Sequence, residues 1–398
     1  MRIEDARALF VGLKDKVFLD AACVSLAPLS TKTEVMKFID MTLHCDQLDA
    51  SAHHIAMDNW RQEAANEAAL LFKAPREQVA LIESTTHGLN IAANAIPWER
   101  GDEVIIADTE FLQVAIPFCK KEEQGLLKVV ALETSPEGFS LDSLIKKITP
   151  RTKAVCISSV QWCTGERLPM KDLGELCRER GIWLIIDGVQ EAGALDVDLS
   201  TRPCDFYIAG GHKWLNAPYG CGVMVFSKRA LELKPSGYGY LSLAAPSGGW
   251  GSYFQNPDQT PFRKYEFARA AQSFETSGTS NYPGAIALGE SIKILNAIGS
   301  KKVEEHVLHL ARFLRQELQK LKVQIVSPEL EASHSGITMF RVSANAKDQV
   351  ALLDRLLEKR IFLSVRYTAN RGGIRASTHY FNNEEDILRL IIALKNEL

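Results

Sequence analysis

The stretch Leu184-Ile-Ile-Asp-Gly-Val-Gln-Glu191 decides the fold, together with the later segment Gly210-Gly-His-Lys-Trp214. The first is an apolar run that ends in one carboxylate, Asp187. The second continues another apolar run, Phe206-Tyr-Ile-Ala209, and carries Lys213. Apolar runs bounded by glycine are typical of buried strands in a parallel sheet, and the carboxyl ends of such strands form a ligand crevice. We therefore expect Asp187 and Lys213 to lie at the same end of adjacent strands.

A carboxylate and an amine at such strand ends are the two groups that a pyridoxal phosphate site requires. The lysine forms a Schiff base with the aldehyde, and the acid keeps the pyridine nitrogen protonated. Either residue alone is common, so the prediction depends on the pair. The pair indicates pyridoxal 5'-phosphate as cofactor, with Lys213 and Asp187 as catalytic residues.

Length and composition narrow the class of protein. A chain of 398 residues suits one large domain and one smaller domain. A formal charge of −3 argues against a nucleic-acid partner, and no apolar run approaches the ~20 residues of a membrane span. The eight cysteines have no zinc-ligand spacing, so we expect no metal site and reduced thiols in a cytoplasmic protein.

Strand-like runs alternate with helical segments through most of the chain. This alternation favours right-handed crossovers and an α/β fold. Strands are also expected at 79–82, 103–107, 128–132, 154–160 and, as a returning antiparallel strand, at 223–226. Short strands at 323–326, 336–342 and 362–365 are expected nearer the C-terminus. We predict a doubly wound, mostly parallel domain over residues 17–284 and a smaller C-terminal α+β domain over residues 285–398. Residues 1–16 form an N-terminal segment that we expect to pack near the small domain.

The order of motifs resembles that of a known family. Asp187-Gly-Val-Gln190 followed by Cys204-Asp-Phe-Tyr-Ile-Ala-Gly-Gly-His-Lys213 is similar to the class V aminotransferase and cysteine desulfurase family of fold-type I pyridoxal phosphate enzymes. The resemblance implies the fold-type I architecture and a small amino-acid substrate. It also implies a homodimer whose active sites are shared between subunits.

Hydroxyl side chains where a helix is expected to begin suggest an anion site. Ser84-Thr-Thr-His-Gly88 precedes a helical pattern, and both helix caps and the helix dipole favour a phosphate there. The alternative for such a stretch is an ordinary helix cap. By resemblance, Thr85 and Thr86 hold the cofactor phosphate and His212 contacts it. Gln190 is expected to donate to the phenolic oxygen of the cofactor.

A further phosphate contact is expected from the partner subunit. Phe274-Glu-Thr-Ser-Gly-Thr279 resembles a family motif whose threonine reaches across the dimer, which makes Thr279 the candidate. The stretch is one residue longer than the family motif, so Ser277 remains an alternative.

The same resemblance assigns residues to the face of the cofactor ring and to the substrate. Phe111 stands where the family carries a histidine after Glu; its ring still offers a flat partner but cannot transfer a proton. The alternative for Phe111 is a core aromatic. Arg375 is expected to hold the substrate carboxylate as a bidentate fork, with Arg366 as a second choice. Ala22 and Trp162 are expected beside the substrate.

Two features bear on the reaction. Trp162-Cys-Thr-Gly165 is similar in style to the cysteine and cystine carbon–sulfur lyase branch. The neighbours of Cys163 give no sign of thiolate activation, so we expect this cysteine to be structural. Desulfurases carry a nucleophilic cysteine between their two arginine segments, but Tyr367-Thr-Ala-Asn-Arg-Gly-Gly373 has none. We therefore expect an external aldimine, α-proton abstraction and β-elimination from a cysteine- or cystine-type substrate.

Other functions remain open on the sequence alone. An aminotransferase or amino-acid epimerase of the same family uses the same first steps. A non-catalytic scaffold would keep the fold but would not need Lys213 and Asp187. A nicotinamide enzyme would carry a glycine fingerprint after a strand, and the sequence has no such fingerprint. The Gly-rich and aromatic loop over 235–261 is expected to be long and functional. Its Trp250 and Tyr253 either line a substrate mouth or pack locally.

Overall fold

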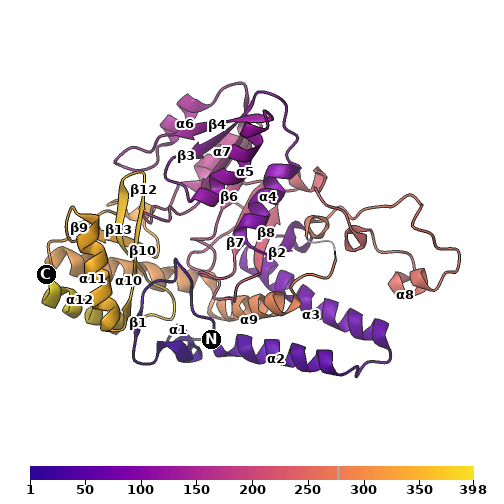
Figure 1. Ribbon diagram of the computed structural model, residues 1–398, viewed down its shortest axis with the longest axis horizontal. Helices are drawn as coiled ribbons and strands as arrows, with labels where there is room; N and C mark the ends of the chain where they lie inside the picture. The colour runs from indigo at the N-terminus through magenta and orange to yellow at the C-terminus, as the bar shows by residue number, and fades with distance from the viewer. Residues whose placement is uncertain (276–277) are drawn as a thin grey trace.

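The computed structural model describes residues 1–275 and 278–398, which form a large α/β unit with a smaller α+β unit beside it (Figure 1). Among these residues, seven strands make the main sheet, in the order β2-β8-β7-β6-β5-β3-β4. The strands are β2 (Val79–Ile82), β3 (Asp102–Ala107), β4 (Leu127–Leu132), β5 (Thr152–Ser158), β6 (Trp183–Asp187), β7 (Phe206–Gly210) and β8 (Gly222–Phe226). Strands β3 to β7 are parallel, and β8 is antiparallel to both β7 and β2. The expected α/β fold with a returning antiparallel strand is confirmed.

Helices cover both faces of this sheet, which explains the continuous apolar runs of its strands. Successive side chains of a strand point to opposite faces. Ile185 accordingly packs in one apolar cluster with residues of α4 and α5, whereas Leu184 and Ile186 pack in another with residues of α6 and α7. These helices are α4 (Thr85–Ala95), α5 (Leu112–Glu123), α6 (Leu141–Lys147) and α7 (Met170–Glu179).

Three long helices lie together beside the main sheet (Figure 1): α2 (Leu29–Leu43), α3 (Ala50–Leu71) and α9 (Tyr282–Ile298). Helix α9 approaches α3 closely at Gly289, where a Cβ atom would lie 2.9 Å from Cα of Ala64. The rings of Phe38 and Tyr282 stack where α2 meets α9. The domain boundary expected from the sequence, residue 285, falls in the first turn of α9.

The smaller unit has an antiparallel sheet in the order β12-β13-β10-β9. Its elements are α10 (Ser300–Lys320), β9 (Gln324–Ile325), β10 (Ile337–Arg341), α11 (Ala346–Glu358), β12 (Ser364–Thr368), β13 (Arg371–Ser377) and α12 (Glu384–Glu397). Strand β1 (Val17–Phe18) pairs in parallel with β11 (Ile361–Phe362). The N-terminal segment, with α1 (Ile3–Ala6), contacts this unit through an ion pair between Arg7 and Asp386.

One long connection leaves the body of the molecule. Residues 238–267, which we call the aromatic arm, extend away from the smaller unit and carry the short helix α8 (Gly249–Phe254) at their far end (Figure 1). Among the described residues, no helix combines the length and the apolar character needed to cross a membrane.

Candidate active site

Asp187 and Lys213 lie at the same edge of the sheet. Asp187 is the last residue of β6, and Lys213 follows the end of β7, the parallel neighbour of β6. The Asp187 carboxylate is 3% exposed and accepts a hydrogen bond of 3.0 Å from the backbone amide of Val189. Burial raises the pKa of Asp187 to about 6, against the opposing effects of that amide and of the Lys213 amine. The group is therefore largely a carboxylate at neutral pH.

Burial has the opposite effect on the Lys213 amine. It lowers the pKa of Lys213 to about 8, while Asp187 raises that pKa and Arg375 lowers it further. The Nζ atom lies 5.9 Å from the centre of the Phe111 ring. An amine with this pKa has a usable neutral fraction near pH 7, which is the form that attacks a carbonyl carbon.

Phe111 is not a core residue, because its side chain is 40% exposed. It lies just before α5 and meets the Trp162 ring edge-on, with ring centres 5.4 Å apart. The Trp162 indole donates to the carbonyl of Thr109 at 3.1 Å, which fixes its orientation. The aromatic face expected at Phe111 is thus present beside Lys213.

Glu110 is a buried acid that the sequence patterns did not single out. It accepts hydrogen bonds from the backbone amide of Ser158 (2.9 Å), the Ser158 hydroxyl and the Gln161 amide (2.8 Å). Burial raises the pKa of Glu110 to about 7, and the Asp187 charge raises it further. The sequence did contain a signal for Glu110, because this residue stands directly before Phe111, where the family carries the glutamate of its Glu-His pair.

The start of α4 meets the end of β7. Ser84 caps α4 by accepting from the amide of His87 at 3.1 Å, and the Thr85 hydroxyl accepts from the amide of Gly210 at 2.9 Å. A Cβ atom on Gly210 would lie 2.8 Å from Oγ1 of Thr85 and 3.2 Å from Nδ1 of His212. Gly210 thus allows the end of β7 to lie close to the start of α4. Thr86 is exposed on the first turn of this helix. Helix amides and hydroxyls in this arrangement suit an anion.

His212 borders the same region. Burial lowers the pKa of His212 to about 4, with a further contribution from Lys213, so its imidazole is neutral. The ring stacks on Tyr219 with ring centres 5.0 Å apart. Neutral imidazole still donates one hydrogen bond, as a phosphate contact would require.

Gln190 joins the N-terminal segment to this edge of the sheet. Its side-chain amide donates to the carbonyl of Ala22 at 3.1 Å, and its side-chain oxygen accepts from the Trp214 indole at 2.8 Å. The contact that Ala22 makes here is therefore through its backbone. The Gln190 amide has a second N–H, which suits the phenolic oxygen expected from the sequence.

Arg375 is almost fully buried, at 2% exposure. Its guanidinium donates to the carbonyl of Trp162 at 3.2 Å and pairs with Asp20 at 3.3 Å. Burial lowers the pKa of Arg375, and Asp20 opposes that change. Among the described residues, its Nε has no hydrogen-bond partner. A buried donor without a partner is costly, which favours a ligand such as a carboxylate.

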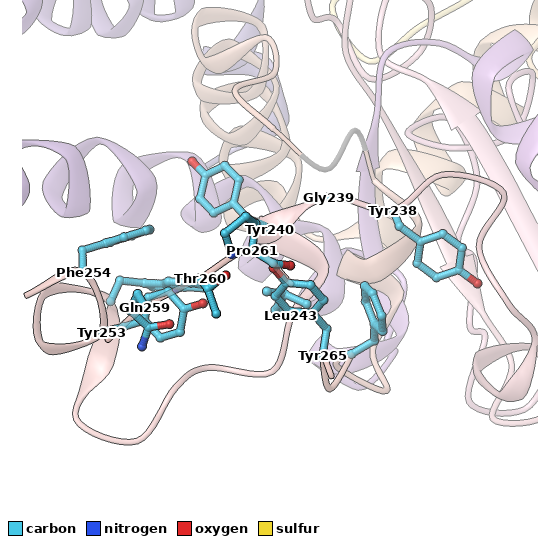
Figure 2. A pocket seen from close by; sticks show the side chains of 12 residues that line it. Tyr238, Gly239, Tyr240, Leu243, Tyr253, Phe254, Gln259, Thr260, Pro261 and Tyr265 are labelled. Atoms are coloured by element: carbon cyan, nitrogen blue, oxygen red, sulfur yellow. The ribbon is translucent and has the colours of Figure 1, made fainter. Parts of the chain in front are cut away.

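Several candidates lie outside this cluster. Thr279 is exposed in the connection before α9, and its alternative Ser277 lies outside the described residues. Trp250 and Tyr253 pack against each other, with ring centres 5.4 Å apart, and line an open cleft of about 490 Å³ whose walls come from the aromatic arm (Figure 2). Cys163 is fully buried, and burial raises its pKa to about 12, as fits a structural thiol.

The cluster fits pyridoxal phosphate. It combines a half-buried amine, a buried carboxylate, an exposed aromatic face and an anion cradle, which is formed by the start of α4 and the end of β7 where these approach closely at Gly210. Lys213 would hold the aldehyde, Asp187 the ring nitrogen, and Thr85, Thr86 and His212 the phosphate.

Several known proteins are similar to this chain in sequence or in structure. The chain is 29% identical over 334 residues to isopenicillin N epimerase of Amycolatopsis lactamdurans, covering 80% of each chain. It is 27% identical over 395 residues to a probable cysteine desulfurase of Xylella fastidiosa, covering 96% of this chain and 90% of that protein. The structure of the cystine C-S lyase C-DES with its reaction product cysteine persulfide superposes with a TM-score of 0.85 at 22% identity, covering 97% and 98% of the two chains.

A family model for the class V aminotransferases matches residues 17–390. The match spans both units of the fold and contains the amine, the carboxylate and the anion cradle of the site. The chain therefore belongs to the class V aminotransferase family of pyridoxal phosphate enzymes.

Proposed function

We propose that this enzyme is a C–S lyase that eliminates a sulfur leaving group from a cysteine- or cystine-type amino acid. The observation that carries the proposal is the tight turn between β12 and β13. Thr368 pairs with Arg371, and the two residues between them, Ala369 (φ 46°) and Asn370 (φ 59°), complete the hairpin. The stretch where desulfurases carry a nucleophilic cysteine is thus closed into a two-residue turn without a thiol. Elimination needs no such thiol.

Each reactive group has a separate task. Pyridoxal phosphate supplies an aldehyde that captures the substrate amine and a ring that accepts electrons from the α-carbon. Asp187 would hold the ring nitrogen of the bound cofactor and keep it protonated. Lys213 Nζ would take the α-proton of the substrate, because its lowered pKa suits a general base near neutral pH.

Arg375 orients the substrate for this step. Its buried Nε offers an unused donor to the substrate carboxylate, while Asp20 and the carbonyl of Trp162 hold the guanidinium plane. Phe111 covers the face of the ring and, lacking a titratable group, leaves the proton chemistry to Lys213. With water, the net products of such an elimination would be the sulfur compound, pyruvate and ammonia.

Epimerisation is the second candidate. The 29% identity to isopenicillin N epimerase supports it. Epimerisation and transamination share the α-proton step with elimination and differ from it only in their later steps. A non-catalytic scaffold is disfavoured, because Lys213 and Asp187 are both intact and lie at the same edge of the sheet.

A homodimer with shared sites completes the proposal. Thr279 is exposed in the single protomer, and the aromatic arm carries exposed rings such as Phe254 (67%) and Phe262 (92%). Exposed apolar groups of this kind favour a protein interface. We assign Thr279 to the phosphate of the partner's site. The eight free cysteines support a reducing compartment such as the cytoplasm.

The products distinguish the candidates. Holoenzyme is supplied with cystine, cysteine and other amino acids, and Lys213→Ala serves as the inactive control. Pyruvate with a persulfide or sulfide supports the lyase, whereas a keto acid with the pyridoxamine form supports an aminotransferase. Inversion of the amino acid without pyruvate supports an epimerase and contradicts the lyase.

A further inference from the structure

A thiol from the N-terminal segment lies inside the active-site cluster. Cys23 is half-buried, and Nη2 of Arg366 donates to its Sγ at 3.2 Å. The thiol is also within electrostatic reach of Lys213 and Arg375. Arg366 thus contacts the sulfur atom, and Lys213 and Arg375 interact with it electrostatically, at a position where the proposed elimination uses no thiol.

Hydrogen bonds fix the segment that carries Cys23. Its backbone amide donates to the carbonyl of Asp20 at 3.0 Å, Gln190 holds the carbonyl of Ala22, and the amide of Ser25 donates to the carbonyl of His212 at 2.9 Å. His212 directly precedes Lys213. The thiol is therefore attached to the catalytic edge of the sheet, not to the β12–β13 turn.

A second observation points to a ligand beside this thiol. Arg375 is 2% exposed, and within the part of the chain that the structure describes its Nε lacks a hydrogen-bond partner. We call Arg366, which contacts Sγ of Cys23, and Arg375, which interacts with that thiol electrostatically, the cationic wall. Such a wall can hold a carboxylate and, next to it, an anionic sulfur atom.

We propose that Cys23 accepts the sulfane sulfur released at this site, so that the enzyme transfers sulfur as well as eliminating it. This inference rests on the proposed C–S lyase function, because elimination from cystine leaves a persulfide, R–S–SH. The Cys23 thiolate attacks the terminal sulfur of that persulfide. One S–S bond forms at Cys23 and the old S–S bond breaks. R–S⁻ leaves and takes up the proton lost by Cys23, with no external oxidant or reductant.

The cationic wall explains why this thiol would be selected. Attack on a persulfide builds negative charge on the departing sulfur, and the guanidinium groups of Arg366 and Arg375 stabilise that charge. Cys45 and Cys119 are exposed, so solution reagents reach them readily. Transfer of sulfur to the half-buried Cys23 in preference to these two exposed residues would therefore indicate a specific acceptor site.

The test uses holoenzyme in two arms, cystine as substrate and glutathione persulfide supplied directly. After trapping with an alkylating reagent, peptide mass spectrometry locates any added sulfur. We expect the Cys23 peptide to gain one sulfur atom in the wild type and in the control variant Cys45→Ser. Cys23→Ser should lose this gain, and Arg366→Gln should reduce it. The cofactor absorbance and circular dichroism of each variant report whether it has folded.

The two arms separate the inference from the function on which it rests. Pyruvate formation from cystine with no sulfur on Cys23 overturns the acceptor role and leaves the lyase standing. If cystine gives no pyruvate, the lyase proposal fails, and the glutathione persulfide arm decides the reactivity of Cys23 by itself. Equal labelling of Cys23, Cys45 and Cys119 in that arm overturns the inference.

Discussion

At the scale of single residues, the site depends on the charge of Asp187. Asp187→Asn keeps the shape and the hydrogen bond from Val189 but removes the negative charge. We expect kcat for pyruvate formation to fall by about 10²–10³, the usual effect of losing one aimed electrostatic group.

Asp205→Asn is the matched control for this loss. Asp205 is also buried, at 6% exposure, and accepts a 2.9 Å hydrogen bond from the amide of Leu184 at the opposite end of the sheet. Both variants should unfold at lower temperature, but only Asp187→Asn should lose turnover per folded protein. Equal kcat in the two variants contradicts the role of Asp187.

The pKa of Lys213 predicts how apoenzyme takes up its cofactor. Only the neutral amine attacks the aldehyde, and burial lowers the pKa of Lys213 to about 8. The rate of cofactor uptake should rise about tenfold per pH unit below that value and level off above it, provided that Asp187, with a pKa of about 6, is ionised. Stopped-flow absorbance measures the rate. A rate still climbing steeply toward the pKa of an unperturbed lysine, about 10.4, would contradict the lowered pKa of this amine.

At the scale of elements, the anion cradle depends on how closely β7 approaches α4. Gly210→Ala puts a methyl group 2.8 Å from the Thr85 hydroxyl and disturbs the hydrogen bond between that hydroxyl and the Gly210 amide. We expect the Kd for pyridoxal phosphate to rise about tenfold, which corresponds to about 1.4 kcal/mol. Absorbance titration of apoenzyme measures it.

Gly237→Ala is the control for this strand–helix contact. A Cβ atom there meets no other atom of the described residues within 4 Å. The Kd of this variant should match that of the wild type. An unchanged Kd in Gly210→Ala would show that the close approach has no part in cofactor binding.

The elements also show what the sequence could and could not predict. Residues next to strand ends, such as Asp187 and Lys213, were predictable because apolar runs bounded by glycine are local patterns that mark where buried strands end. Glu110 was overlooked although its motif was recognised, since its burial comes from Ser158 and Gln161 on a neighbouring strand end. The Arg366–Cys23 contact joins residues 343 positions apart. No local pattern encodes such a separation.

The smaller unit was harder to predict in detail. Its Arg375 segment was recognised by motif, but the strand β13 that carries it and the final helix α12 were not anticipated. Strand β13 contains two glycines at positive φ, Gly372 (126°) and Gly373 (158°), which weaken a strand signal. Pairing with both β10 and β12 makes this stretch a strand, and that pairing is a tertiary effect.

At the scale of the whole molecule, the single protomer leaves apolar surface exposed. The aromatic arm extends from the body (Figure 1), and its rings pack mainly on each other, as between Trp250 and Phe254. Thr279 lies on the same long connection as the arm, before α9. If a second copy covers this surface, the two-fold symmetry of a dimer brings each connection to the other's site.

Complementation between variants tests the shared site. Lys213→Ala and Thr279→Ala protomers are mixed in equal amounts under conditions that exchange subunits. In the mixed dimer, the site with an intact Lys213 receives an intact Thr279 from its partner, whereas the other site lacks both. Random exchange makes about half of the dimers mixed, with one working site each, so we expect about a quarter of wild-type activity.

Mixing Lys213→Ala with Asp187→Asn is the control, because Lys213 and Asp187 of one site belong to the same chain. In that mixed dimer one site lacks the amine and the other lacks the carboxylate, so exchange restores neither site. Activity should stay at the residual level of Asp187→Asn. Mass spectrometry under native conditions verifies exchange in both mixtures. Exchange without any rise in activity would contradict the shared site: activity stays near zero if Thr279 serves its own chain, and stays at about half of wild type if Thr279 has no part in the site.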